Sequence, residues 1–248
     1  MDTKESIINT LRDDKEYYTG VGRQYFSNSD INNLISNPKS YGVQQGDSLP
    51  FLQGRLFHTL ILEPEKAAAM ISKAVDVASR NTKVYKEASE NAGGEMLLLT
   101  KEVLATEKMV STMLGNMDFF DLIRDDNNIY EQPAIGNIMG HNFKGKADII
   151  TNDYVIDLKT TGNIRKFKWS AKTYGYNSQA YIYQKLFGKP MKFLVVDKTT
   201  LELGMFDPST DFIGEGQDRV EEGLRVHAQF YGENPTSSIE DYYIYDNL

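Results

Sequence analysis

The chain has no cysteine among its 248 residues. It can therefore form no disulfide, no zinc site with thiolate ligands and no iron–sulfur cluster. It also lacks an apolar run long enough to span a bilayer, and its first residues, 1–6, show neither the basic start nor the apolar stretch of a signal peptide. We therefore expect a cytoplasmic protein that has no membrane partner.

A positive net charge is also missing. The formal charge is −8, which argues against a nucleic-acid partner because phosphate binding uses Lys and Arg. The charge is uneven, however. Residues 201–248 carry eleven acids against two arginines, a balance of −9 that leaves about +1 for the rest of the chain. Residues 140–175 carry seven bases against three acids, which gives +4. This basic stretch keeps a nucleic-acid partner open.

Charged residues interrupt two apolar segments near the middle of the sequence. The segments 149–150 and 154–158 predict two short strands joined by a turn. Asp148, Asp157 and Lys159 lie among them, and buried charges survive only when they are paired or bind a metal. Asp157 and Lys159 point to the same face of a strand. Two carboxylates joined in this way can hold Mg²⁺, and the ammonium can face a phosphate or an attacking water.

An Asp on one strand followed by Asp-x-Lys on the next resembles the PD-(D/E)xK nuclease superfamily. By itself, Asp157-Leu158-Lys159 also fits an ordinary edge strand with a solvated ion pair. The resemblance implies an α/β fold with a restriction-endonuclease-like core, in which helices flank a central mixed sheet, and an N-terminal helical portion. The absence of cysteine excludes the cluster-bearing branch of that superfamily.

A second segment in the first third of the chain resembles the phage RecE-like exonucleases. Gly54 and His58 are four residues apart on a predicted helix, and Leu62-Glu63-Pro64-Glu65 follows. This matches the Gly-x-x-x-His segment of that family and implies that His58 reaches the metal site. The alternative is a histidine packed in the core.

Two more segments follow the order of the same family. The run 174–183 resembles its Tyr-Gly-Tyr-x-x-Gln-x-x-x-Tyr helix, which implies that Tyr176, Gln179 and Tyr183 border the active site and the DNA. The tyrosines also fit a role in core packing. Glu131, one strand before Asp148, is implied to complete the carboxylate set, although a single Glu at a strand start is often solvent-exposed.

The resemblance assigns roles to these residues. It implies that Asp148, Asp157 and the backbone carbonyl of Leu158 hold Mg²⁺, for which Mn²⁺ substitutes, as one or two ions per site. His58 and Glu131 join the same ion or a second one. Lys159 positions or deprotonates the attacking water, and Gln179 holds substrate or water. The side chains expected to contact DNA also include Arg55, Lys144, Lys146, Arg165, Lys166 and Lys168.

The resemblance thus predicts a Mg²⁺-dependent exonuclease that degrades linear double-stranded DNA, from the 5′ end, in phage-type recombination, replication or DNA degradation. It implies DNA as a partner, a single-strand annealing protein as a further one, and a closed homo-oligomer. An endonuclease or flap nuclease with the same ligands remains open, as does a catalytically inactive DNA-binding module. End-labelled linear DNA and closed circular DNA distinguish these three.

The pattern of elements predicts a single nuclease domain over residues 1–232. Residues 1–120 are expected to form a mainly helical wall, 121–232 the αβ catalytic core, and 233–248 a linker with an acidic, aromatic tail. The expected helices cover 29–37, 49–62, 65–80, 100–117, 165–187 and 210–231. The expected strands cover 128–134, 138–150, 154–160, 191–198 and 201–206.

Overall fold

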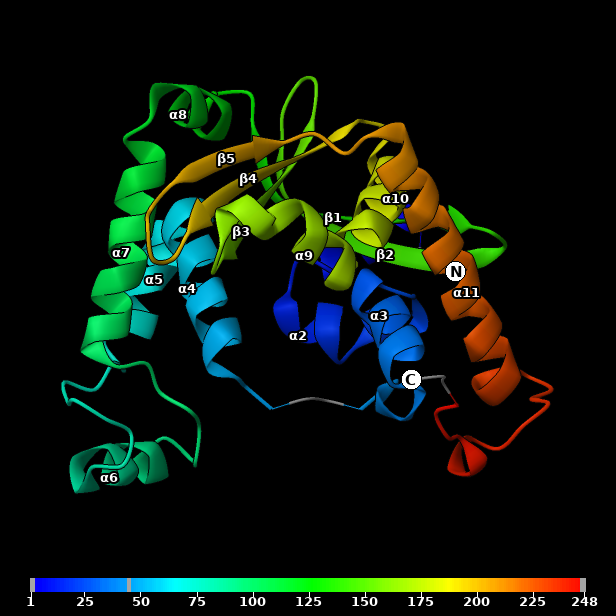
Figure 1. Ribbon diagram of the computed structural model, residues 1–248, viewed down its shortest axis with the longest axis horizontal. Helices are drawn as coiled ribbons and strands as arrows, with labels where there is room; N and C mark the ends of the chain where they lie inside the picture. The colour runs from blue at the N-terminus through cyan, green and yellow to red at the C-terminus, as the bar shows by residue number, and fades with distance from the viewer. Residues whose placement is uncertain (1–2, 44–45, 246–248) are drawn as a thin grey trace.

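The computed structural model describes residues 3–43 and 46–245 and is built around one five-stranded sheet in the order β1-β2-β3-β4-β5 (Figure 1). The strands are β1 Ile129–Ile138, β2 His141–Ile150, β3 Val155–Thr161, β4 Met191–Asp197 and β5 Leu203–Phe206. Only β3 and β4 run parallel, and the other neighbours are antiparallel. The predicted mixed sheet is confirmed.

The first two strands form a long hairpin. Its tight turn consists of Met139 and Gly140, which both have positive φ (52° and 82°), the geometry that matches the twist of paired strands. The sequence predicted a break between 134 and 138, but β1 continues through it to Ile138. By contrast β4 is buried along its whole length, as expected for a strand with a parallel neighbour and helices on both faces.

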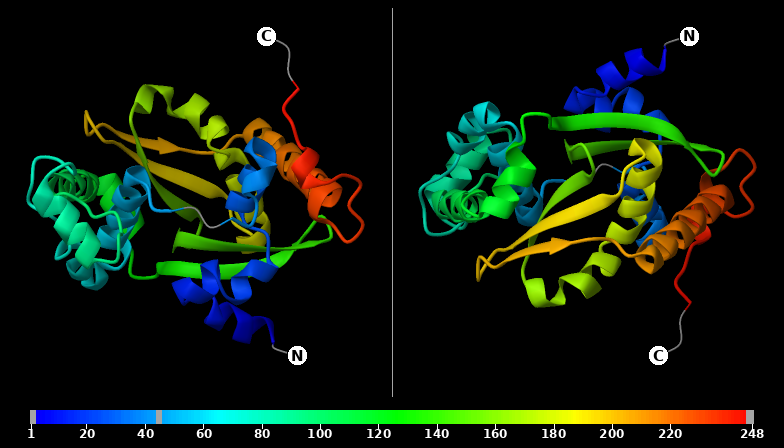
Figure 2. Two further views of the ribbon diagram at one scale, coloured as in Figure 1. Left: turned by 90° about the horizontal axis from the view of Figure 1, so that it is seen from below. Right: turned by 90° about the horizontal axis from the view of Figure 1, so that it is seen from above.

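Helices cover both faces of the sheet (Figures 1 and 2). On one face, Phe143, Val155 and Phe193 pack against four helices. These are α3 Asn28–Ser36, α9 Phe167–Thr173, α10 Tyr176–Phe187 and α11 Thr210–Tyr231. On the other face, Ile156 and Leu194 pack against three helices. These are α4 Leu49–Leu62, α7 Thr100–Leu114 and α8 Met117–Arg124.

The helices of the first 120 residues therefore do not form one wall. The helix α3 packs on α11 across one face of the sheet, whereas α4 and α7 pack together on the other. Two short N-terminal helices, α1 Lys4–Thr10 and α2 Asp14–Tyr18, lie along the β1–β2 hairpin. The remaining helical segments are α5 Pro64–Ile71, α6 Lys83–Asn91 and the 3₁₀ turns η1 Val21–Gln24, η2 Pro38–Ser40, η3 Ile164–Lys166 and η4 Ile239–Asp241.

The helix predictions need two corrections. The helix expected over 65–80 ends at Ile71, because Val75 leaves it to form a bridge with Leu99. The helical stretches expected over 165–187 are α9 and α10, which Gly175 separates with a left-handed φ of 68°. The sequence also missed α6 and α8. Among residues 3–43 and 46–245, none of the helices has the length and apolar character needed to cross a membrane.

Candidate active site

The candidate site lies where two neighbouring strands separate. The strands β2 and β3 pair only at Ile149–Ile156 and Ile150–Val155. Beyond these pairs, the Leu158 N–H donates to Oδ2 of Asp148 at 2.7 Å instead of to a backbone carbonyl. The N–H and C=O of one residue in an extended strand point to the same side. The Leu158 carbonyl therefore also points towards the space between the strands.

Asp148 on β2 meets His58 on α4. Nε2 of His58 lies 3.0 Å from Oδ2 of Asp148, and Nδ1 lies 2.8 Å from the carbonyl oxygen of Gly54. The fully buried side chains of Phe57 and Ile61 fix α4 against the sheet. Burial acts to lower the pKa of His58, but Asp148 outweighs it and raises this pKa to about 9. The structure thus brings His58 to the carboxylate rather than into the apolar core.

The pKa of Asp148 is shifted in the opposite direction to that of His58. Burial acts to raise its pKa, but His58, Lys159 and the Leu158 N–H together hold the pKa of Asp148 below its usual value. The side chain is only 14% exposed. Asp148 is therefore a buried carboxylate that its surroundings keep ionised.

Asp157 on β3 is the second carboxylate. Its Oδ1 accepts a hydrogen bond of 2.5 Å from Nε2 of Gln179 on α10. Its Oδ2 lies 2.5 Å from Nζ of Lys159, but in the part of the chain that the structure describes it accepts no well-directed hydrogen bond. Burial and the negative charge of Asp148 raise the pKa of Asp157, although Lys159 acts to lower it. This oxygen is under-satisfied in a buried place.

Lys159 completes the motif on the same strand face. Burial acts to lower its pKa, but Asp157, Tyr176 and Asp148 raise it above the ordinary value. The ring of Tyr176 lies 4.7 Å from Nζ. Lys159 therefore stays charged although its side chain is only 17% exposed.

Glu131 on β1 lies across from Asp148. The flanking pairs Tyr130–Ile149 and Gln132–Ala147 fix this register. Glu131 has a φ of 47°, a conformation that costs energy for a side chain other than glycine. Burial and the charge of Asp148 raise the pKa of Glu131 to about 7. The strained backbone holds a further acid near Asp148.

The expected DNA contacts divide into buried and exposed side chains. Lys144 is 6% exposed and donates to the Tyr17 carbonyl at 2.5 Å, so the prediction of a phosphate contact does not fit its place. Lys146 is paired with Asp14 at 2.6 Å. Tyr183 is buried and donates to the carbonyl of Lys146 at 2.9 Å, which is a structural role.

The other expected contacts are accessible. Arg55 lies over the ring of Phe51 at 4.6 Å and approaches Asp47 at 3.3 Å. On the segment from η3 to α9, Arg165 is paired with Glu202, while Lys166 and Lys168 are exposed. Tyr176 is half-buried against Lys159, and Gln179 is buried against Asp157.

The sequence reading missed the helix α2. Its Tyr17 ring lies 4.4 Å from Nζ of Lys144 and 4.8 Å from Nζ of Lys146, two residues before Asp148 on β2. The next residue, Tyr18, is 63% exposed. Two adjacent tyrosines in an otherwise polar N-terminal segment, after the N-cap Asp13, were the available signal.

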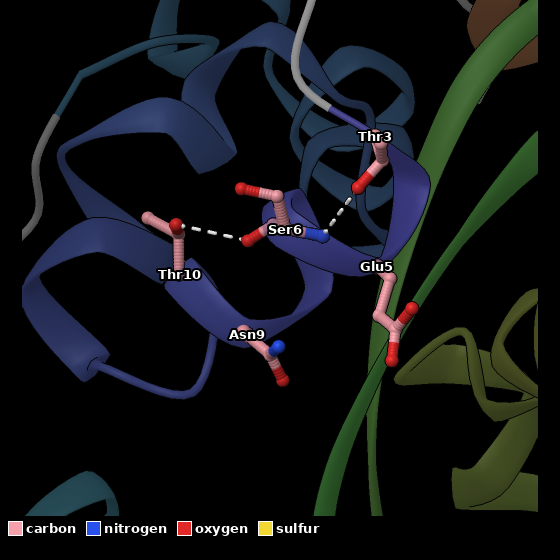
Figure 3. Close-up of a pocket in the computed structure, with 5 residues that line it drawn as sticks. All are labelled: Thr3, Glu5, Ser6, Asn9 and Thr10. Carbon is pink, nitrogen blue, oxygen red and sulfur yellow. Dashed lines mark hydrogen bonds between the residues drawn. The ribbon is translucent and has the colours of Figure 1, made fainter.

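A hollow of about 550 Å³ beside α1 is a different surface feature (Figure 3). It is lined by Thr3, Glu5, Ser6, Asn9 and Thr10. The hydrogen bonds drawn there belong to the helix itself, since Thr3 caps Ser6 N–H at 3.2 Å and Thr10 donates to the Ser6 carbonyl at 3.1 Å. The hollow is part of the surface of α1, and it is not lined by His58, Glu131, Asp148, Asp157, Lys159 or Gln179.

The donor set fits a hard cation bound by few protein ligands. Within the described ranges, no group of three His, Cys, Asp or Glu side chains converges as a cage for a metal ion. Mg²⁺ is usually held by one or two carboxylates and retains water. The under-satisfied Oδ2 of Asp157, the nearby Asp148 and the Leu158 carbonyl meet that requirement.

Comparisons with known proteins identify the family and agree with the fold. Residues 35–237 match the family described as "PDDEXK-like domain of unknown function (DUF3799)". A solved structure described as a "putative exonuclease" from Eubacterium rectale superposes with a TM-score of 0.64 at 16% identity, covering 87% of this chain and 85% of that one. The structure of SSO0001 gives a TM-score of only 0.32 at 14% identity, with 80% and 84% covered, and carries no argument. No curated protein matches the chain.

Proposed function

This chain belongs to the PDDEXK-like family DUF3799, and on that premise we propose that it is a Mg²⁺-dependent exonuclease acting on linear double-stranded DNA. Family membership and fold support a nuclease. The finer proposal, including degradation from the 5′ end and a place in phage-type recombination, replication or DNA degradation, rests on the RecE-like segments around His58 and Gln179.

One observation carries the proposal. Asp148, Asp157 and Lys159 meet at the separation of β2 and β3, where His58 from α4 and Gln179 from α10 contact the two carboxylates. Such a gathering of buried charges costs folding free energy, and clusters of this kind are concentrated at sites of chemistry. It therefore supports hydrolysis at this site over a DNA-binding module without activity.

Asp148, Asp157 and the Leu158 carbonyl are the proposed Mg²⁺ ligands, with Mn²⁺ as a substitute. His58 and Glu131 are proposed to complete the shell of one or two ions. When bound, the ion supplies Lewis-acid polarisation of the phosphodiester and a more acidic water. The protein contributes carboxylates that are already positioned before the ion binds.

The remaining roles belong to the protein's own groups. Lys159 is proposed to orient the attacking water and to offset the negative charge that develops on the phosphate. Gln179 holds Oδ1 of Asp157, which leaves Oδ2 directed away from the amide. His58 holds Asp148 in its ionised form by their 3.0 Å contact.

The test uses purified protein with linear duplex DNA labelled at one 5′ or one 3′ end, and with covalently closed circular DNA, each with Mg²⁺ and with EDTA. Loss of linear DNA alone, only with Mg²⁺, is the expected result. Early release of the 5′ label as mononucleotide supports the proposed direction. Cutting of the circle indicates an endonuclease, and no cutting of either substrate indicates a module without nuclease activity.

The proposed assembly is a closed homo-oligomer, with a single-strand annealing protein as an additional partner. A ring around DNA makes digestion processive because the enzyme cannot leave the strand sideways. Light scattering is expected to give a multiple of the 28.1 kDa chain, and digestion is expected to continue after excess unlabelled DNA is added. A mass of one chain together with immediate arrest by competitor excludes the ring.

A further inference from the structure

Two exposed tyrosines lie near the candidate site. Tyr18 is 63% exposed and Tyr174 is 61% exposed. Each contacts a second tyrosine whose ring lies next to a lysine of the site. Tyr18 meets Tyr17 with centroids 5.0 Å apart, and Tyr174 meets Tyr176 with centroids 5.8 Å apart.

The backbone that displays Tyr174 is held by several side chains. The Tyr174 carbonyl accepts a hydrogen bond of 3.1 Å from Asn32, and the next carbonyl, that of Gly175, accepts one of 3.1 Å from Asn28. Arg219 in turn binds Oδ1 of Asn32 at 3.1 Å. A Cβ at Gly175 would lie 2.0 Å from Oδ1 of Asn32, so α3 packs directly against the turn. Tyr174 is therefore presented on a fixed backbone.

Tyr18 is displayed in a similar way. The carbonyl of the preceding Tyr17 accepts the buried ammonium of Lys144 at 2.5 Å. Gly22 closes the segment, because a Cβ there would lie 2.0 Å from that same carbonyl oxygen. A buried lysine is costly unless its ammonium is bound. The contact between Lys144 and the Tyr17 carbonyl therefore fixes the end of α2 against β2. The Tyr18 ring remains accessible.

The two tyrosine pairs lie next to lysines of two different strands, β2 and β3. Tyr17 covers Lys146, two residues before Asp148 on β2, whereas Tyr176 covers Lys159, two residues after Asp157 on β3. Figure 2 shows α2 and α9, which ends next to Tyr174, on opposite sides of the β1–β2 hairpin. Each of the two strands that carry an aspartate of the site thus has an accessible tyrosine next to the ring that covers its lysine.

We propose that Tyr18 and Tyr174 are stacking positions for unpaired nucleobases on either side of the scissile phosphate. Every nucleobase has a flat face that stacks on an aromatic ring, so this contact tolerates any sequence. A base held in a duplex has both faces covered by its neighbours. The substrate strand is therefore unpaired where it crosses the site, and the proposed exonuclease must separate a duplex end before it cuts. This inference rests on the proposed function because it treats the bound strand as the substrate that is cut.

The test measures binding without cleavage. Single-stranded oligonucleotides of one sequence, each with 2-aminopurine at a different position, are titrated with the Asp157→Asn protein in EDTA, and fluorescence and anisotropy are recorded. Tyr18→Ala and Tyr174→Ala, each added to Asp157→Asn, are expected to weaken binding about 5- to 100-fold, since stacking on one ring contributes about 1–3 kcal/mol per base. They are also expected to abolish the stacking-dependent fluorescence change at one position of the probe each.

Three controls separate stacking from folding. Tyr18→Phe and Tyr174→Phe keep the ring and are expected to bind like the parent. Tyr243→Ala removes a tyrosine that is 76% exposed in the C-terminal segment and is expected to change nothing. A fully paired hairpin is expected to show no dependence on either tyrosine. Melting temperatures should match for all variants.

The inference is wrong if both alanine variants bind the single strand like the parent, or if the phenylalanine variants fail as the alanine variants do. These outcomes do not depend on cleavage. A protein without nuclease activity whose binding follows the tyrosines contradicts the proposed function alone, and an active nuclease whose binding ignores them contradicts this inference alone.

Discussion

Two aspartates on the adjacent parallel strands β3 and β4 are equally buried and have opposite surroundings. Asp157 and Asp197 are each 3% exposed. Oδ1 of Asp197 accepts the N–H groups of Thr199 at 2.8 Å and Thr200 at 3.0 Å, and Oδ2 accepts the Ile164 N–H at 2.8 Å. In Asp157, Oδ2 has only the ammonium of Lys159 beside it and accepts no well-directed hydrogen bond among the described residues.

The pKa directions follow this difference. Burial acts to raise both values, but the three backbone N–H groups hold the pKa of Asp197 below its ordinary value, whereas burial and Asp148 raise the pKa of Asp157. Burial alone therefore does not mark a functional carboxylate. A satisfied aspartate organises a turn, and an under-satisfied one beside other charges is available for chemistry.

The largest expected effect comes from Asp157→Asn. The variant should lose cleavage by about a thousandfold or more, because the proposed ion loses a ligand, while its melting temperature falls, because the buried ammonium of Lys159 loses its paired carboxylate. Single-turnover cleavage and thermal unfolding measure the two effects. Cleavage within about tenfold of the parent would remove Asp157 from the proposed ligands.

Lys159→Met tests the partner of Asp157 without removing a proposed ligand. Cleavage at saturating Mg²⁺ should fall about a hundredfold to a thousandfold, because charge on the phosphate is no longer offset. Mg²⁺ affinity, measured by calorimetric titration, should change far less than in Asp157→Asn. Identical titrations for the two variants would contradict the separate roles.

Asp197→Asn tests the other side of the comparison. It should reduce the free energy of unfolding by about 3 kcal/mol, since an amide cannot accept all three backbone hydrogen bonds. Cleavage at a temperature where the variant is folded should stay near that of the parent. The lowered pKa of Asp197 means that its contribution is present above its ordinary pKa and is lost as the pH falls. Urea unfolding at pH 7 and at a pH below the ordinary value of 3.8 measures both effects, and the difference between the variant and the parent should shrink at the lower pH.

The smallest expected effect concerns His58. Its folded pKa of about 9 exceeds the ordinary 6.5, so in EDTA its contribution to stability is complete below about pH 6.5 and is lost as the pH rises through about 9. Because the pKa of Glu131 is raised from 4.5 to about 7, the free energy of unfolding also falls as the pH rises from 4.5 to 7. Urea unfolding between pH 7 and pH 9.5 therefore isolates His58.

The control for this prediction is His58→Gln, which should show a flatter profile above pH 7. In the cleavage assay, the same variant should need more Mg²⁺ or Mn²⁺ for a given rate if His58 is a ligand. Parallel unfolding profiles for the variant and the parent would show that the Asp148–His58 contact contributes no proton-linked stability.

Long amphipathic helices with clear end signals were predicted from the sequence. The helix α4 Leu49–Leu62 ends where expected, because Pro64 begins a new helix after it. The helix α11 Thr210–Tyr231 begins where expected, because Ser209 caps its N-terminus. The missed helices α6 and α8 are short, and helices of that length depend on tertiary packing. The helix predicted over 65–80 stops before Val75, because Val75 forms a bridge with Leu99, a residue distant in the sequence.

From the sequence alone came the five strand positions of a mixed sheet and the resemblance to the PD-(D/E)xK superfamily, both confirmed, and the prediction that His58, Glu131, Asp148, Asp157, Lys159 and Gln179 form one site. Motif spacing carries this information because strand periodicity fixes which neighbours share a face. Only the tertiary structure decided which lysines are accessible. Lys144 is 127 residues from the Tyr17 carbonyl that binds it, and no local pattern encodes a contact of that range. The same contact places Tyr18 beside the site, because burial depends on what the distant segments of the chain pack against.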